Sequence, residues 1–436
     1  MKNSNHLPES EIPYRINKKG ILTNFLLFLF CALFSNFVFS QGENPAIKYL
    51  NSMNKYLQLP EADAKNNALG QYASALAAYD TSFYTKNQKQ LDQNFETGWK
   101  GDPIATQAIT NASKSLALIY EGNKKPLIKY PHWSKTGIKQ PFEMHIPNFL
   151  AAQCLGKTLV LSAMNWEAGR NYNAAITTYE NCLIFGERMV GDNCALISKL
   201  ISIAVQSMAV NQIQKFLKRS LLDEKQYYNL ILILNKNEEN HYPIWKSFAG
   251  EADALKWTLV NPEKALQLAI ENKEKPEVIE QYKLFIPKKD LLVKQHDEFW
   301  NAVINANKQP YPESRKFDVN AEIKKLDKVL QVTVPNYLEA YTRDLVLVAK
   351  RRLALINATL RMYKLNNKAF PNDLNALGLK PNLTTDPFVE RPFVYRNIGG
   401  KITLYSLGPN MTDEGGRTIY DPKKGTVSVG DIVAEF

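Results

Sequence analysis

Residues 386–436 read DPFVERPFVYRNIGGKITLYSLGPNMTDEGGRTIYDPKKGTVSVGDIVAEF and predict a small β-sheet at the end of the chain. Two stretches of alternating polar and apolar residues, 391–398 and 401–407, flank Gly399-Gly400. This dipeptide suits a tight hairpin turn, because glycine adopts the positive φ angles that such a turn requires. Residues 426–436 supply a third strand.

The helix that covers this sheet is expected at residues 336–365. Its apolar residues recur at intervals of three and four and form one stripe: Leu345, Ala349, Leu353, Ile356, Leu360 and Tyr363. Basic residues occupy the other faces: Arg343, Lys350, Arg351 and Arg361. Because the stripe must be covered, we expect one helix laid on a small antiparallel sheet.

This order of elements resembles the globular head of a G-type pseudopilin of the type II secretion system. The similarity covers roughly the last quarter of the chain. It includes the helix, the segment YKLNNKAFPNDLNALG (363–378), the DPF and RPFVYR strand, the LYSLGPN strand and an acidic glycine loop that ends at Asp431. The resemblance implies a pseudopilin-like domain over residues 332–436.

The resemblance also implies a calcium site, because the equivalent loop of that family binds calcium through backbone carbonyls and acidic side chains. The matching ligands are the side chains of Asp413, Asp431 and Glu414 and the carbonyl of Ser406. Two features depart from the family. Asn410 stands where an aspartate is usual, and the segment RTIYDPKKGTVSVG (417–430) lengthens the loop. The alternative is a polar glycine turn with ordinary surface acids.

Length and composition place the chain among globular proteins. It has 436 residues, 45% of them hydrophobic, which is enough for two or three domains. The formal net charge is +11, but the basic residues are scattered as pairs along predicted helices. We therefore expect solvated basic helix faces and no nucleic-acid site.

The first 40 residues have the features of a targeting segment. Arg15, Lys18 and Lys19 precede an apolar run at residues 21–39. Val38 and Ser40 provide the small residues that a signal peptidase requires, which predicts export and cleavage before residue 41. The alternative is an uncleaved anchor, because residues 21–39 approach the length of a membrane span. Either reading predicts a periplasmic or cell-envelope location, with membrane contact only through this segment.

Residues 44–330 predict a domain of stacked α-helical hairpins. The expected helices lie near residues 45–58, 62–88, 104–121, 147–168, 172–190, 194–218, 222–236, 245–270 and 287–305. One hairpin resembles a tetratricopeptide repeat, with a turn at Gly169 followed by Tyr172, Ala175, Tyr179 and Cys182. No second copy follows at a regular period, so an irregular stack is expected. Together with the C-terminal sheet, this gives an α+β fold.

No motif predicts catalysis. His132, His145, His241 and His296 stand apart without a metal-binding or triad pattern, and Glu238-Glu239 is expected on a turn. His296 is expected at the surface. Cys154 and Cys182 could form a disulfide across the hairpin, although buried thiols are the more common arrangement.

These features favour an exported, non-enzymatic interaction or scaffold protein that binds an unknown envelope protein through its helical region. Two alternatives remain. The first is a subunit of a type II secretion or pilus-like system. The second is a hydrolase or lyase of an envelope polymer, whose groove would be lined by tryptophans: Trp133, Trp166, Trp245, Trp257 or Trp300.

Overall fold

The computed structural model describes residues 65–130, 148–191, 194–271 and 273–436. The protein is mostly helical, with two small antiparallel sheets near the C-terminus. This confirms the predicted α+β fold class. The predicted targeting segment and the helix expected at residues 45–58 lie outside the described residues.

The helices of the first half form successive hairpins. They are α4 (Leu69–Ala78), α5 (Ser82–Lys86), α6 (Gln88–Thr97), α7 (Pro103–Lys124), α8 (Phe149–Ala168), α9 (Tyr172–Glu187), α10 (Leu196–Arg219) and α11 (Glu224–Glu239). Among the described residues, α10 alone has the length and apolarity to cross a membrane, and 67% of its most apolar window is buried inside the protein. Helix α10 is therefore packed as a core helix.

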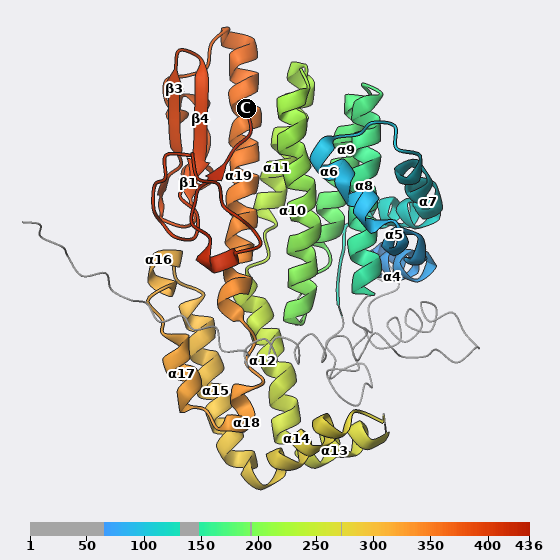
Figure 1. The fold of residues 1–436 in the computed structure, drawn as a ribbon, viewed down its shortest axis with the longest axis vertical. Coiled ribbons are helices and arrows are strands. Elements are labelled where there is room, and N and C mark those ends of the chain that lie inside the picture. The colour runs from blue at the N-terminus through green and yellow to red at the C-terminus, as the bar shows by residue number, and fades with distance from the viewer. Residues whose placement is uncertain (1–64, 131–147, 192–193, 272) are drawn as a thin grey trace, which may run out of the picture.

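A second group of helices follows below the first in Figure 1. It comprises α12 (Ile244–Val260), α13 (Pro262–Glu271), α14 (Pro276–Phe285), η4 (Ile286–Lys288), α15 (Lys289–Ala306), α16 (Tyr311–Ser314), α17 (Val319–Lys325) and α18 (Lys328–Gln331). The single helix predicted at 245–270 is wrong. Pro262 lacks an N–H and restricts Asn261, so the chain breaks there into α12 and α13.

The helix predicted at 62–88 is also divided. The Asp80 carboxylate accepts hydrogen bonds from the backbone N–H (2.8 Å) and the hydroxyl (2.7 Å) of Ser82. This local turn ends α4 and allows α5 to begin, because short polar side chains compete with the helix for backbone donors. Helix α11, in contrast, begins close to its predicted start, where Asp223 and Gln226 form a reciprocal capping box.

The C-terminal segment consists of one long helix and short strands. They are α19 (Tyr337–Asn367), η5 (Leu374–Leu377), α20 (Pro381–Thr384), β1 (Thr385–Asp386), β2 (Arg391–Pro392), β3 (Val394–Ile398), β4 (Lys401–Ser406), η6 (Gly425–Val427) and β5 (Ile432–Val433). Strands β1 and β2 pair with each other, and β3, β4 and β5 form a second antiparallel sheet in that order. Gly399 and Gly400 both have positive φ, as the hairpin requires.

The third strand is shorter than predicted. Only Ile432 and Val433 belong to β5, whereas Gly425–Val427 forms a 3-10 turn. The buried carboxylate of Asp386 connects the two sheets. It accepts hydrogen bonds from the Phe388 N–H (3.0 Å), the Ser406 hydroxyl (2.9 Å) and the Leu407 N–H (2.8 Å).

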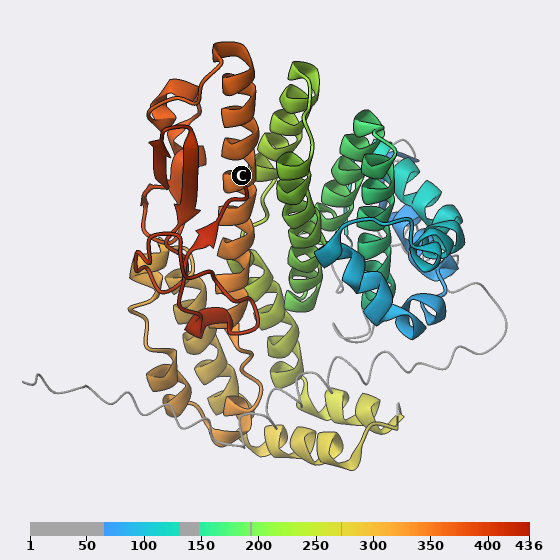
Figure 2. The same cartoon turned by 45° about the horizontal axis from the view of Figure 1, so that its top comes forward.

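Helix α19 lies between the sheet and the rest of the molecule. In both Figure 1 and Figure 2 the strands flank one side of α19, and α10 and α11 flank the other. Its buried residues therefore extend beyond the predicted stripe and include Arg351, which is 0% exposed. One continuous apolar cluster runs from the helices of the first half through α19 to strand β4 and Ile432.

Two glycines allow α8 and α9 to approach α10 closely. A Cβ atom at Gly156 would lie 2.9 Å from Val205 Cγ2, and one at Gly186 would lie 2.8 Å from Gln206 Cγ. Neither distance leaves room for a side chain. Val205 is itself 0% exposed, so it cannot move aside into solvent.

We predict that Gly156→Ala lowers the free energy of unfolding by roughly 1–3 kcal/mol, because it overpacks the contact between α8 and α10. Urea unfolding measures the loss. In the Val205→Ala background, which makes space for the added methyl group, the same substitution has a smaller cost. An equal cost in both backgrounds would contradict this packing.

Candidate functional site

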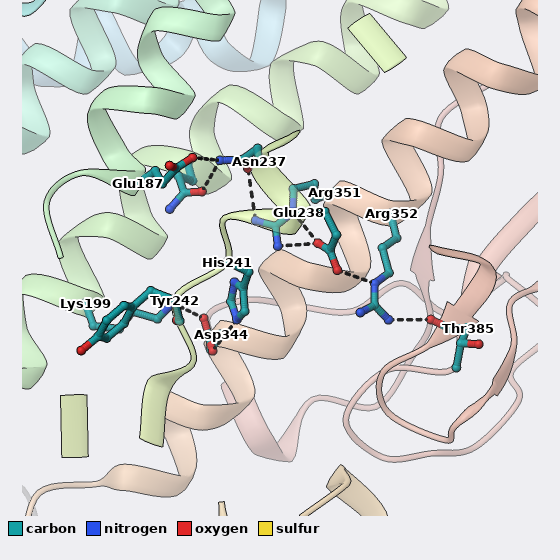
Figure 3. Close-up of polar contacts among 11 residues, drawn as sticks. Glu187, Lys199, Asn237, Glu238, His241, Tyr242, Asp344, Arg351, Arg352 and Thr385 are labelled. Carbon is teal, nitrogen blue, oxygen red and sulfur yellow. Dashed lines mark hydrogen bonds and ion pairs between the residues drawn. The ribbon is translucent and has the colours of Figure 1, made fainter. Parts of the chain in front are cut away.

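A set of buried charges lies where α10, α11 and α19 meet. Glu238, in the last turn of α11, lies between two consecutive arginines of α19 (Figure 3). Glu238 Oε2 accepts a hydrogen bond from Arg351 Nε at 2.6 Å, and Oε1 accepts one from Arg352 Nε at 2.7 Å. Arg351 also donates to Asn237 Oδ1 at 3.2 Å. Both carboxylate oxygens of Glu238 are therefore occupied.

A second group of charges lies two turns earlier on α19. The Asp344 carboxylate pairs with Lys199 Nζ of α10 at 2.7 Å and with His241 Nε2 at 3.2 Å. Lys199 also donates to the backbone oxygen of Tyr242 at 2.6 Å. The side chains of Lys199 and Asp344 are 1% and 3% exposed. Together with the first group, these residues form what we call the α19 charge network.

The charges of the network support one another. Burial alone would raise the pKa of Asp344, but His241 and Lys199 hold it well below its usual range. Burial would likewise raise the pKa of Glu238, but Arg351 and Arg352 keep it lowered. Burial lowers the pKa of His241, whereas the Asp344 carboxylate beside its Nε2 acts in the opposite direction.

The network also reaches the sheet. Arg352 Nη1 donates to the backbone oxygen of Thr385 in β1 at 2.9 Å (Figure 3). On the opposite side, Asn237 donates to Glu187 of α9 at 3.2 Å and to Gln206 of α10 at 3.0 Å. One set of hydrogen bonds and ion pairs thus joins α9, α10, α11, α19 and β1. The network has a structural role, because its polar groups hold these elements together through contacts within the protein.

The predicted calcium ligands divide into two pairs. Asp413 Oδ1 accepts hydrogen bonds from the Tyr405 hydroxyl (2.8 Å) and the Gly415 N–H (2.7 Å). The Ser406 hydroxyl donates to Asp386, and Ser406 is paired with Ile432 in the β4–β5 ladder. Leu404 accepts from Ala434 in the same ladder, so alternation directs the Ser406 carbonyl toward β5. Asp413 Oδ1 and the Ser406 carbonyl are therefore used for hydrogen bonds within the fold.

Asp431 and Glu414 each keep a carboxylate oxygen without a partner. Asp431 Oδ2 accepts from the Gly416 N–H at 2.7 Å, but its buried Oδ1 has no hydrogen-bond partner in the described residues. Glu414 Oε1 accepts from Asn410 at 2.7 Å, whereas Oε2 is buried and likewise unpartnered there. Burial raises the pKa of Asp431 to about 6, and Glu414 and Asp413 act in the same direction.

These two acids fit a cation, but they do not complete a site. Within the described residues, no group of three or more His, Cys, Asp or Glu side chains converges on one point. A calcium ion takes six to eight oxygens, so Asp431 and Glu414 would need backbone carbonyls and water for the remainder. The structure thus favours Asp431 and Glu414 over Asp413 and Ser406 within the predicted set.

Other residues considered for chemistry lie apart. The prediction that His296 is a surface residue is wrong. It is 3% exposed on α15, and its Nδ1 lies 3.0 Å from Asp297 Oδ1. Trp300 is 3% exposed and cannot line an open groove, whereas Trp166 is 43% exposed at the end of α8. His132, His145 and Trp133 lie outside the described residues.

The cysteines are buried. Cys154 and Cys182 are free thiols, so the disulfide considered between them is not formed. Cys182 packs against the backbone oxygen of Gly156, with a distance of 3.6 Å between its sulfur and that oxygen. Cys194 is also buried. The expectation of buried thiols is confirmed for the hairpin pair.

Sequence reasoning missed the network because its members are far apart in the chain. Glu238 was expected on a turn, but it lies within α11 and is 9% exposed. Arg351 was assigned only to a face away from the apolar stripe. One signal was available: two consecutive arginines interrupt the most apolar part of α19, and a buried face with cations needs acids from a neighbouring helix.

Comparisons with known proteins add no relative. No family model, curated protein or solved structure matches the chain.

We predict that Arg351→Met lowers the free energy of unfolding by roughly 3–5 kcal/mol, because it leaves the buried Glu238 carboxylate with one cation in place of two. Arg343→Met is the matched control. Arg343 lies on the same helix, but its ion pair with Glu339 is half exposed and should contribute about 0.5 kcal/mol. Urea unfolding compares the variants, and equal losses would contradict a structural role for the network.

Proposed function

We propose that this protein is an exported, non-enzymatic interaction or scaffold protein. Its helical region binds an envelope protein, and its C-terminal segment acts as a pseudopilin-like docking module. The support is chemical. The buried charges pair with one another within the protein. Trp300 and His296 are enclosed in the core, away from any substrate. An envelope location follows from the targeting features of residues 1–40.

The observation that carries this proposal is an exposed apolar stripe on α11. Leu221, just before the helix, is 90% exposed, Tyr228 is 53% exposed and Leu232 is 48% exposed. Tyr228 and Leu232 are four residues apart and lie on one face of the helix, whereas Leu221 precedes the capping residue Asp223. Leu230 and Leu234 on the opposite face are buried, and α11 packs against α19 and α9. Such a stripe suits the apolar face of a partner helix.

The arrangement of α19 favours this role over that of a pilus-like subunit. In pseudopilins the membrane helix continues directly into the head. Here α19 begins at Tyr337 after the short helix α18, and it is covered by the sheet on one side and by α10 and α11 on the other. A helix enclosed in this way has little surface left for packing into a fibre.

Cross-linking from the stripe tests the function. We expect a photoreactive residue at position 228 or 232 to capture one reproducible envelope protein in cells. The control position is Ile270 on α13, which is 54% exposed and lies outside the stripe. Equal capture from position 270, or turnover of an envelope polymer by the purified protein, would overturn the proposal.

We also propose that the C-terminal loop binds calcium through Asp431 and Glu414. Each has a buried carboxylate oxygen with no hydrogen-bond partner among the residues that the structure describes. Bound calcium would offset the mutual repulsion of the two carboxylates.

Millimolar Ca²⁺ should therefore raise the melting temperature of the full chain, because a ligand that binds only the folded state adds stability by mass action. Calorimetry measures the shift. Asp431→Asn with Glu414→Gln should abolish the shift, whereas Asp413→Asn should retain most of it. Absence of any shift in the natural sequence, or an unchanged shift in the double variant, would remove the assignment.

A further inference from the structure

The segment 417–430 that lengthens the C-terminal loop is held firmly against the protein. The Thr426 N–H donates to Glu339 Oε2 of α19 at 3.1 Å, and the Asp421 N–H donates to Ser428 Oγ at 2.7 Å. A Cβ at Gly425 would collide with the Glu339 carboxylate, so the turn lies directly on α19. Tyr420, near the start of the segment, is 6% exposed.

The same segment presents three branched aliphatic side chains to solvent. Ile419 is 56% exposed, Val427 is 70% exposed and Val429 is 58% exposed. Ser428, between the two valines, is 1% exposed and points inward, so the valines project outward on either side of it. Ile419 is adjacent, because its backbone lies 2.8 Å from the place where a Gly430 Cβ would be. We call these three residues the aliphatic knob.

Basic residues occur in the same segment as the knob. Lys424 accepts the hydrogen bond from the Val427 N–H at 3.2 Å through its backbone oxygen, so the two residues share one turn. The segment contains Arg417, Lys423 and Lys424 but only one acid, Asp421. All three basic side chains are exposed. Lys423 and Lys424 form no ion pair with any residue in the described part of the chain.

We propose that the aliphatic knob and its lysines form a peripheral contact with an anionic lipid surface. Exposed branched aliphatic groups gain free energy when they enter the boundary between headgroups and acyl chains, and flanking cations are attracted to anionic headgroups. A bilayer fits both properties, because it offers apolar depth below a layer of negative charge. The anchoring to Glu339 holds the knob in place before contact, which limits the ordering cost of binding. This contact is separate from the predicted N-terminal segment and from the partner surface on α11.

Lipid contact can be measured locally in the full chain. An environment-sensitive fluorescent amino acid replaces Val427, and the protein is reconstituted with phosphatidylglycerol or phosphatidylcholine vesicles that carry brominated acyl chains as quenchers. A matched probe replaces Leu232, which is 48% exposed on α11. The local readout is independent of any membrane insertion by residues 21–39.

We expect a blue shift and quenching at position 427 in phosphatidylglycerol vesicles, with neither change at position 232. Lys423→Glu with Lys424→Glu should reduce the ratio of bound to free loop by more than about fivefold for each lysine, since each reversal removes one attraction and adds one repulsion. Equal signals at both positions, or a signal at 427 that persists after charge reversal and in phosphatidylcholine, would overturn the proposal. So would a shift that appears only when envelope proteins are added, because the surface would then bind protein.

Discussion

The buried carboxylate of Glu238 and the two arginines that enclose it determine how the parts of this protein are joined. Arg351 is 0% exposed, and its guanidinium contacts Glu238 at 2.5 Å. A charge so deeply buried is tolerated only when an opposite charge lies in hydrogen-bonding geometry beside it. Helix α19 can therefore occupy its place only when α11 supplies Glu238 in the correct position.

This constraint makes α19 a shared element. Its apolar residues meet the sheet and the neighbouring helices, while Arg352 joins Glu238 to the backbone of β1. Asp344 repeats the arrangement two turns away with Lys199 of α10. A buried ion pair adds little net stability over apolar packing, but it penalises alternative registers of the helices. We infer that the network fixes the register of α19 against α10 and α11.

The sequence predicted those elements whose signals are local. The periodic apolar residues predicted α19 to within two residues of each end, and Gly399-Gly400 predicted the hairpin between β3 and β4. The break at Pro262 was missed although proline is a local signal, since the apolar pattern continued through it. Strand β5 lies within the third strand predicted at residues 426–436 but has only two residues, and the two-residue strand β1 is too short to give an alternating pattern in the sequence.

The candidate site was harder to predict, because its residues lie far apart in the chain. Glu238 and Arg351 are 113 residues apart, and nothing in either local sequence identifies the other. The loop acids were found through a family resemblance, but the sequence could not show that Tyr405 and Gly415 occupy Asp413 while Asp431 Oδ1 has no partner in the described residues. The hydrogen-bond partners of a side chain depend on the tertiary structure, which the local sequence does not show.

Native-state hydrogen exchange tests most directly whether α19 unites the two parts. If the network joins them, the slowest amides of α11 (Glu224–Glu239), α19 (Tyr337–Asn367) and β4 (Lys401–Ser406) should exchange through one opening with a common free energy and denaturant dependence. Exchange of α11 through a separate, lower-energy opening, while α19 and β4 remain protected, would contradict the account.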